Sequence, residues 1–242
     1  MNITLPDGKA VNALRDALVR DFLAKDLSLP SEYSYGSVPL CIVDSVFSIQ
    51  SRYPTTQATV RRWAAYANWP LLKGSLTDEH TVSDFLEKMA GLDAENLASN
   101  IFQNRQRTSS TSGILKSQAV REFAEALVQE KLERFSDFED RSRLGRAETL
   151  IRKIKGQGSG VTWKYFLMMA GGDEFIKPDT WICRYVARVT SRVRVDAPEA
   201  EALLLAAIAI IKTLRPEITP RQIDHAIWNS ERSRPLTNET SR

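Results

Sequence analysis

The chain has 242 residues, of which 43% are hydrophobic, so it is long enough to bury the core of one large domain or of two small ones. Its 33 lysine and arginine residues exceed its 30 acidic residues, which gives a formal charge of +3. This mild excess permits nucleic-acid binding but does not require it, because the clustering of the charges decides which partner is attracted.

Composition also excludes several kinds of protein. No apolar run is long enough to span a membrane and the N-terminus lacks a signal-peptide pattern, so we expect a cytoplasmic protein without membrane contact. Cys41 and Cys183 lie in apolar segments, so we expect reduced core residues. Two cysteines cannot hold an iron–sulfur cluster by themselves. His80 and His225 are far apart, so no side-chain metal site is expected.

Nearly every periodic segment has apolar residues at helical spacing, and the expected fold is all-α, with about ten helices. The apolar run 39–50 could be a buried strand, but no partner strand is evident, so we expect a buried helix. Thr219 and Gln222, with Pro220 between them, predict a capping box at a helix start. The predicted helices cover residues 9–24, 39–50, 55–67, 82–90, 115–132, 143–154, 197–214 and the segment from 219 onward.

Two segments outside these helices are polar. Residues 105–113, RQRTSSTSG, form a polar and basic stretch between two predicted helices. The last ten residues, 233–242, are polar and expected to be a disordered tail.

Three glycines alternate in the stretch KGQGSG, at Gly156, Gly158 and Gly160, between two helical segments. A turn between helices often needs positive φ, which glycine adopts easily, but one glycine would be enough for a helix end. Three predict a hairpin whose uncovered backbone amides, with the start of the next helix, favour a phosphate. The alternative is a plain turn with solvated lysines; the lysines around it are Lys153, Lys155 and Lys164.

A single acid, Asp179, follows Pro178 and begins a further helical pattern. Aspartate is a common helix N-cap, and that role alone could explain it. A carboxylate held ionised at a helix start could also stabilise an oxocarbenium-like sugar and direct a water molecule while an N-glycosidic bond breaks.

Together these features resemble the helix–hairpin–helix/Gly-Pro-Asp superfamily of DNA glycosylases. The family's hairpin PGxGxKxA corresponds to residues 155–162, and its catalytic (V/P)D(T/V) corresponds to residues 178–180. IVDSVFSIQSR resembles an early family helix that ends in a pocket-lining or gap-filling Gln, here Gln50, and GILKSQAVREFAEAL resembles the family's G(L/F)xxxKAxxI helix. In the family's order, these motifs cover roughly residues 38–190.

Departures from the family pattern indicate the reaction. The hairpin's leading proline is Lys155, and no C-terminal four-cysteine cluster follows. Gly160 stands where bifunctional members have the lysine that forms a Schiff base with the sugar. The resemblance therefore implies a monofunctional glycosylase, in which Asp179 directs water. The alternatives are a non-catalytic DNA-binding module and a lyase that uses a non-aligned lysine such as Lys155.

The resemblance also implies the partner and the remaining site residues. The partner is double-stranded DNA with a damaged or modified base, which must be flipped out of the helix. The residues expected at the DNA backbone are Lys155, Gly156, Gly158, Gly160, Lys164 and Lys116. The residues expected at a base pocket or plug are Gln50, Arg52, Tyr53, Trp163 and Trp181, although core packing could explain each tryptophan and a solvated loop could explain Gln50 and Arg52. A monovalent cation held by hairpin carbonyls would fit the family pattern, without any other cofactor.

We expect two helical lobes with an active-site cleft between them. One lobe would be residues 36–172, ending in the hairpin, and the other would combine residues 1–35 and 173–242 and carry Asp179. We expect a monomer, associated with the nucleoid if the source is bacterial. The motifs do not identify the excised base.

Overall fold

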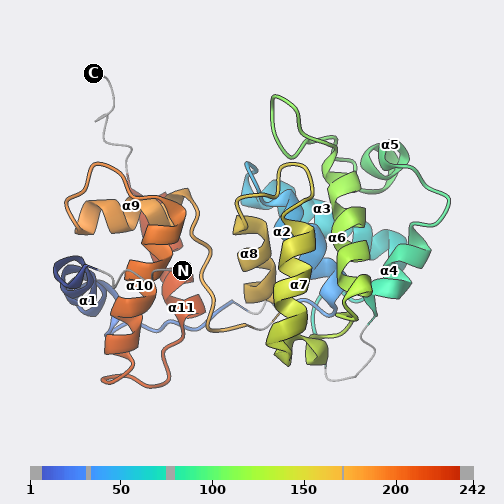
Figure 1. Cartoon of the computed structure of the whole chain (residues 1–242). Coiled ribbons are helices and arrows are strands. Elements are labelled where there is room, and N and C mark those ends of the chain that lie inside the picture. The colour runs from blue at the N-terminus through green and yellow to red at the C-terminus, as the bar shows by residue number, and fades with distance from the viewer. Residues whose placement is uncertain (1–6, 31–33, 75–79, 171, 235–242) are drawn as a thin grey trace. The chain divides into compact units, whose positions relative to one another are not determined.

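The computed structural model describes residues 7–30, 34–74, 80–170 and 172–234. Within these ranges the fold consists of eleven α-helices without strands, which confirms the all-α prediction (Figure 1). The helices are α1 Gly8–Phe22, α2 Val38–Phe47, α3 Tyr53–Ala67, α4 Val82–Lys88, α5 Ala94–Asn96, α6 Lys116–Gln129, α7 Arg141–Ile151, α8 Val161–Met169, α9 Thr180–Val189, α10 Ala197–Ile211 and α11 Pro220–Arg232. A π-helical turn, η2 (Leu97–Ile101), and a 3-10 turn, η3 (Phe135–Glu139), complete them.

The chain divides into two compact units. The first unit joins Met1–Leu29 to Asp173–Arg242, and the second is Pro30–Gly172. The boundaries expected from the sequence were residues 35–36 and 172–173. The expected tail lies outside the described residues from 235 onward.

Helices α1, α9, α10 and α11 form the first unit around one apolar core. Helix α9 turns Ile182, Tyr185 and Val186 inward, so that its arginines lie on the outer face. The predicted capping box of α11 is confirmed: Gln222 N donates to Thr219 Oγ1 (3.3 Å) and Thr219 N donates to Gln222 Oε1 (2.9 Å). This local motif fixes where α11 begins, which matters for the site below.

Helix α2 lies at the centre of the second unit. All ten of its residues are buried, and it packs against α3, α4, α6 and α8. This complete burial explains why the segment is nearly continuous in apolar residues, and the helix expected there is confirmed. Nearby, Trp63 packs edge-on against Phe85, with ring centroids 4.5 Å apart, and stacks on Phe102 at 5.6 Å.

The predicted helix over 39–50 is too long, because α2 ends at Phe47. Gln50 has φ of 52°, a left-handed conformation that a helix cannot continue through. The helical segment over residues 94–101 was not predicted. It consists of a short α-turn followed by a π-helical turn in which only Leu97 and Ala98 are buried, so it has no apolar stripe at ordinary helical spacing.

Cys41 is buried and Cys183 is partly buried, and neither forms a disulfide among the described residues. The expectation of a core position therefore holds fully for Cys41 only. None of the described helices is long and apolar enough to cross a membrane.

Candidate functional site

The α7–α8 hairpin has the left-handed turns that its glycines suggested, but at two positions rather than three. Gly156 has φ of 88° and Gly160 has φ of 77°, whereas Gly158 has no positive φ. Gly158 therefore adopts a backbone conformation that does not require glycine. Gly158 is nevertheless exposed, and its backbone lies open on the hairpin.

Gly156 is required by a close approach as well as by its φ. A Cβ there would lie 2.5 Å from Thr108 Oγ1, far inside contact distance. That hydroxyl donates to the carbonyl of Lys155 (2.8 Å) and accepts from the amide of Ile114 (3.2 Å). The polar loop 105–113 is thus fastened to the hairpin, and Figure 1 shows both at the same end of the second unit.

Gly160 is the N-cap of α8 and has no side chain to accept from the first amides of that helix. The space beside it is taken by Arg152, since a Cβ on Gly160 would lie 3.3 Å from Arg152 Nη1. Arg152 Nε donates to the carbonyl of Gly158 (3.2 Å), and Nη1 pairs with Glu148 (3.2 Å). A guanidinium therefore borders the position where the resemblance places a lysine in bifunctional enzymes. Lys155 is exposed on the same turn.

Lys116 does not lie where the sequence suggested. Its side chain is 1% exposed, and Nζ donates to the carbonyls of Phe47 (3.1 Å) and Ile49 and to Gln106 Oε1 (3.1 Å). The predicted contact with the DNA backbone is therefore wrong, because interior oxygens surround the ammonium group. Instead, Lys116 ties the α2–α3 turn to the start of the 105–113 loop.

The plug candidates lie on the α2–α3 turn. Gln50 and Arg52 are exposed, whereas Tyr53 is partly buried at the start of α3. The bond from Lys116 to Ile49 holds this turn, and the bond from Lys116 to Gln106 links it to the loop that contacts the hairpin. The structure thus brings three predicted segments to one end of the second unit: the α2–α3 turn, the loop 105–113 and the hairpin (Figure 1).

The two tryptophans have different surroundings. Trp163 is 2% exposed, and its ring packs on Phe166 (5.5 Å) and Phe123 (6.1 Å), so it belongs to the core of the second unit. Its predicted place in an open base pocket is wrong, because α8 turns this side chain inward. Trp181 is partly buried on α9 in the first unit, with the guanidinium of Arg184 5.2 Å from its ring centroid. Lys164 is partly buried on α8.

Asp179 is the N-cap of α9. Its Oδ1 accepts from the amides of Trp181 (2.8 Å) and Ile182 (3.4 Å), so the capping role is confirmed. Its Oδ2 lies 3.8 Å from Lys177 Nζ, and the side chain is 24% exposed. One oxygen therefore orients the carboxylate and the other faces a cation, on a side chain that is partly exposed.

Sequence reasoning missed a second carboxylate behind Asp179. Asp224, on α11, is 7% exposed, and its Oδ1 accepts from the amide of Lys177 (2.8 Å). Burial, and then the negative charge of Asp179, raise the pKa of Asp224 to about 8. The available signal was an acid on the inner face of an amphipathic helix, beside Ile223 and one turn from Ile227.

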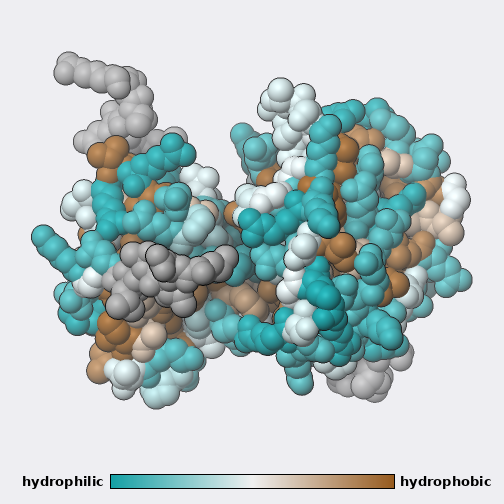
Figure 2. Space-filling model, in the orientation of Figure 1, coloured by the Kyte–Doolittle hydropathy of each residue, from teal (hydrophilic) through white to brown (hydrophobic). Residues whose placement is uncertain are grey.

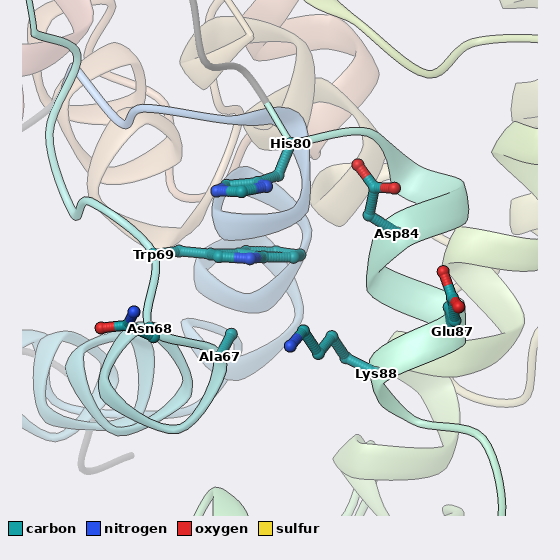
Figure 3. A pocket seen from close by; sticks show the side chains of 7 residues that line it. All are labelled: Ala67, Asn68, Trp69, His80, Asp84, Glu87 and Lys88. Carbon is teal, nitrogen blue, oxygen red and sulfur yellow. The ribbon is translucent and has the colours of Figure 1, made fainter.

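A separate hollow on the second unit is less suited to a nucleic acid. In Figure 3 the His80 ring lies flat on Trp69, with centroids 4.3 Å apart and planes 9° apart, so the indole face is already covered. Asp84, on the rim of this hollow, belongs to a capping box. The hydrogen bond from the Thr81 amide is the main cause that lowers the pKa of Asp84. Glu87 adds a second acid, which would repel phosphates, beside Lys88.

Metal ligands do not gather in the described ranges: no three His, Cys, Asp or Glu residues there are arranged to hold an ion.

Residues 13–232 match the model of a protein family described as a domain of unknown function, DUF8548. The match covers most of the chain, so the chain belongs to this family. Neither a curated protein nor a solved structure matches the chain.

Proposed function

We propose that this protein is a monofunctional DNA glycosylase, which flips a damaged or modified base out of a duplex and hydrolyses its N-glycosidic bond. The observation that carries the proposal is the geometry of Asp179. Its Oδ1 is held by two helix amides, and its Oδ2 faces Lys177 on a side chain that is partly exposed. Such an oriented carboxylate can stabilise positive charge on a sugar and position the attacking water.

DNA binding would be supplied by the end of the second unit. The hairpin offers the start of α8, whose N-cap Gly160 brings no acidic side chain, together with the exposed Gly158 and the exposed cation of Lys155. Amides at a helix start and lysine side chains both attract phosphate without reading sequence. Gln50 and Arg52, exposed on the neighbouring turn, are candidates to fill the gap left by the flipped base.

Water, rather than a lysine, would be the nucleophile. Gly160 cannot form a Schiff base because it has no side-chain amine, and the group beside it is the guanidinium of Arg152 rather than a lysine. The products would be a free base and an intact abasic strand.

The test is a set of duplex oligonucleotides, each with one modified base, incubated with the protein and then split into two portions. We expect strand breakage only in the portion treated with alkali, and no covalent protein–DNA adduct after borohydride. Breakage without alkali together with a trapped adduct would show a lyase, with Lys155 as the first nucleophile to replace. Duplexes that all stay intact after alkali would contradict a glycosylase of the tested bases.

A second function is favoured by one observation. The two amide bonds to Asp179 give it a structural role that needs no chemistry. A non-catalytic DNA-binding module would keep the hairpin and this cap. It would bind modified and unmodified duplexes equally and release no base from either.

A further inference from the structure

The segment that carries Asp179 is fastened by the first turns of α11. Arg221 N donates to the carbonyl of Asp173 (3.1 Å), and the Arg221 guanidinium lies 3.6 Å from the Asp173 carboxylate. Further along, the Lys177 amide donates to Asp224 (2.8 Å). Ile176 is fully buried between these two attachments. Helix α11 therefore holds both ends of the loop that precedes Asp179.

A continuous run of hydrogen bonds leads from Asp224 to Asp179. Asp224 Oδ1 accepts from the Lys177 amide, and the Lys177 carbonyl accepts from the Asp179 amide at 2.7 Å. The Asp179 carboxylate then accepts from the first amides of α9. Lys177 is therefore the single residue that links Asp224 to the backbone of Asp179 in this run of hydrogen bonds.

Burial, with the negative charge of Asp179, favours the neutral form of Asp224. The charged groups that face it are Asp179 and Lys177 from the α9 side and Arg221 from its own helix. Burial is the main cause that raises its pKa to about 8, and the negative charge of Asp179 adds to it; the Lys177 amide and the two cations act in the opposite direction. A protonated Asp224 can still accept the Lys177 amide on Oδ1.

We propose that Asp224 is a positioning residue that must stay neutral: it holds the Lys177 amide, and through it Asp179, without placing a second negative charge behind the working carboxylate. Its effect on base release rests on the proposed glycosylase function, whereas its coupling to Asp179 does not. Ionised Asp224 would repel Asp179 and attract Lys177 away from it. Base release should therefore require the protonated form of Asp224 and the ionised form of Asp179.

Two variants separate charge from geometry. Asp224→Asn is neutral at every pH and can accept the same amide, whereas Asp224→Leu is neutral but cannot. In wild type, single-turnover base release should fall about tenfold per pH unit above pH 8, because only the protonated fraction is active. The Asn variant should keep the neutral-pH rate and lose this decline. The Leu variant should be at least about tenfold slower at every pH, because the loop loses its attachment.

Carboxyl-carbon NMR provides a readout that does not depend on activity. The Asp224 carboxyl should titrate near pH 8 in wild type, and the Asp179 carboxyl should shift in the same pH range. The shift of Asp179 should vanish in Asp224→Asn. An Asp179 signal that ignores this range, or a pH decline unchanged in the Asn variant, would overturn the inference. If no duplex loses a base but the two carboxyls remain coupled, the glycosylase proposal fails and the positioning role stands.

Discussion

Two helix N-termini in this protein are built in opposite ways. At α9 the carboxylate of Asp179 accepts from the amides of Trp181 and Ile182, so the helix start is closed by a negative charge of its own. At α8 the N-cap is Gly160, which has no side chain, and the Val161 amide donates to the neutral Ser159 Oγ (3.4 Å), so no negative charge closes this helix start. The first arrangement presents an anion, and the second can receive one.

The supports behind the two N-termini differ in the same way. Thr108 holds the hairpin before α8 through the carbonyl of Lys155, and Gly158 beyond it is exposed. The buried Asp224 and the partly buried Arg221, both on α11, hold the loop before α9. A turn that binds phosphate needs space and a catalytic carboxylate needs restraint, so the two helix starts suit the two roles that we propose for them. Substitutions at the α9 start, in the second unit and at the hairpin before α8 should test this comparison, from the largest expected effect to the smallest.

Asp179→Asn should separate charge from capping at α9. An asparagine oxygen can accept the same amides, so the free energy of unfolding should change by about 1 kcal/mol or less. Loss of one well-placed charge should slow single-turnover base release by about 10²–10³. DNA affinity should hold or rise, because a negative charge near phosphates is removed.

Asp196→Asn is the matched control, because Asp196 caps α10 in the same unit by accepting from the Glu199 amide. It should leave base release unchanged. A wild-type rate in a well-folded Asp179→Asn protein would remove the catalytic role and leave the DNA-binding module.

Lys116→Met should destabilise the second unit by about 2–3 kcal/mol, since three interior oxygens lose their charged donor. Denaturant unfolding measures this effect, and Lys88→Met, at an exposed lysine of α4, is the control. DNA affinity should fall only to the extent that the loss of these hydrogen bonds displaces the α2–α3 turn. Unchanged stability with a large loss of affinity would show instead that the ammonium reaches DNA.

Gly158→Ala tests whether the hairpin backbone meets DNA. The position has no positive φ, and a new Cβ would meet only the carbonyl of Arg152 at 3.8 Å, so folding should be unaffected. If a phosphate approaches this backbone, the methyl group should block it and weaken duplex binding by about tenfold, or about 1.4 kcal/mol. Fluorescence anisotropy measures the affinity.

Gly145→Ala, on the exposed face of α7, makes the same change where nothing lies within 4 Å. Its DNA affinity should match wild type. Gly156→Ala is the wrong choice for this purpose, because its Cβ would collide with Thr108 and disturb the fold itself. Equal affinities for the Gly158 and Gly145 variants would take the hairpin backbone out of the contact surface.

The smallest effect concerns single exposed cations. Lys155→Ala and Arg52→Ala should each weaken DNA binding by a few fold and reduce the slope of log affinity against log salt by about 0.9, if each contacts one phosphate. Figure 2 shows hydrophilic residues over much of the displayed face of the protein, so a control cation away from the hairpin is needed. Lys88→Ala, beside the acidic rim of the hollow in Figure 3, should leave the slope unchanged.

Local signals in the sequence predicted the helices well. The Thr219 capping box, the buried run that became α2 and the glycine turns at 156 and 160 depend on residues close together in the chain, so spacing alone reveals them. The capping position of Asp179 is local for the same reason.

Other features depend on partners that the sequence does not place together. The resemblance implied that Lys116 contacts DNA, yet Lys116 is buried and its carbonyl partner Phe47 lies 69 residues away in the chain. Trp163 could have been a pocket residue or a core residue, and only the packing of α8 decided for the core.

By itself, the sequence determined an all-helical chain with a glycine hairpin and an aspartate at a helix start, because caps, turns and apolar periodicity act over a few residues. The tertiary structure decided which polar groups hold the loops before α8 and α9 in place. Thr108 meets Lys155, and Asp224 meets Lys177, each across 47 residues. Burial then made Asp224 a weak acid, since the cost of a charge depends on the surroundings that distant segments create.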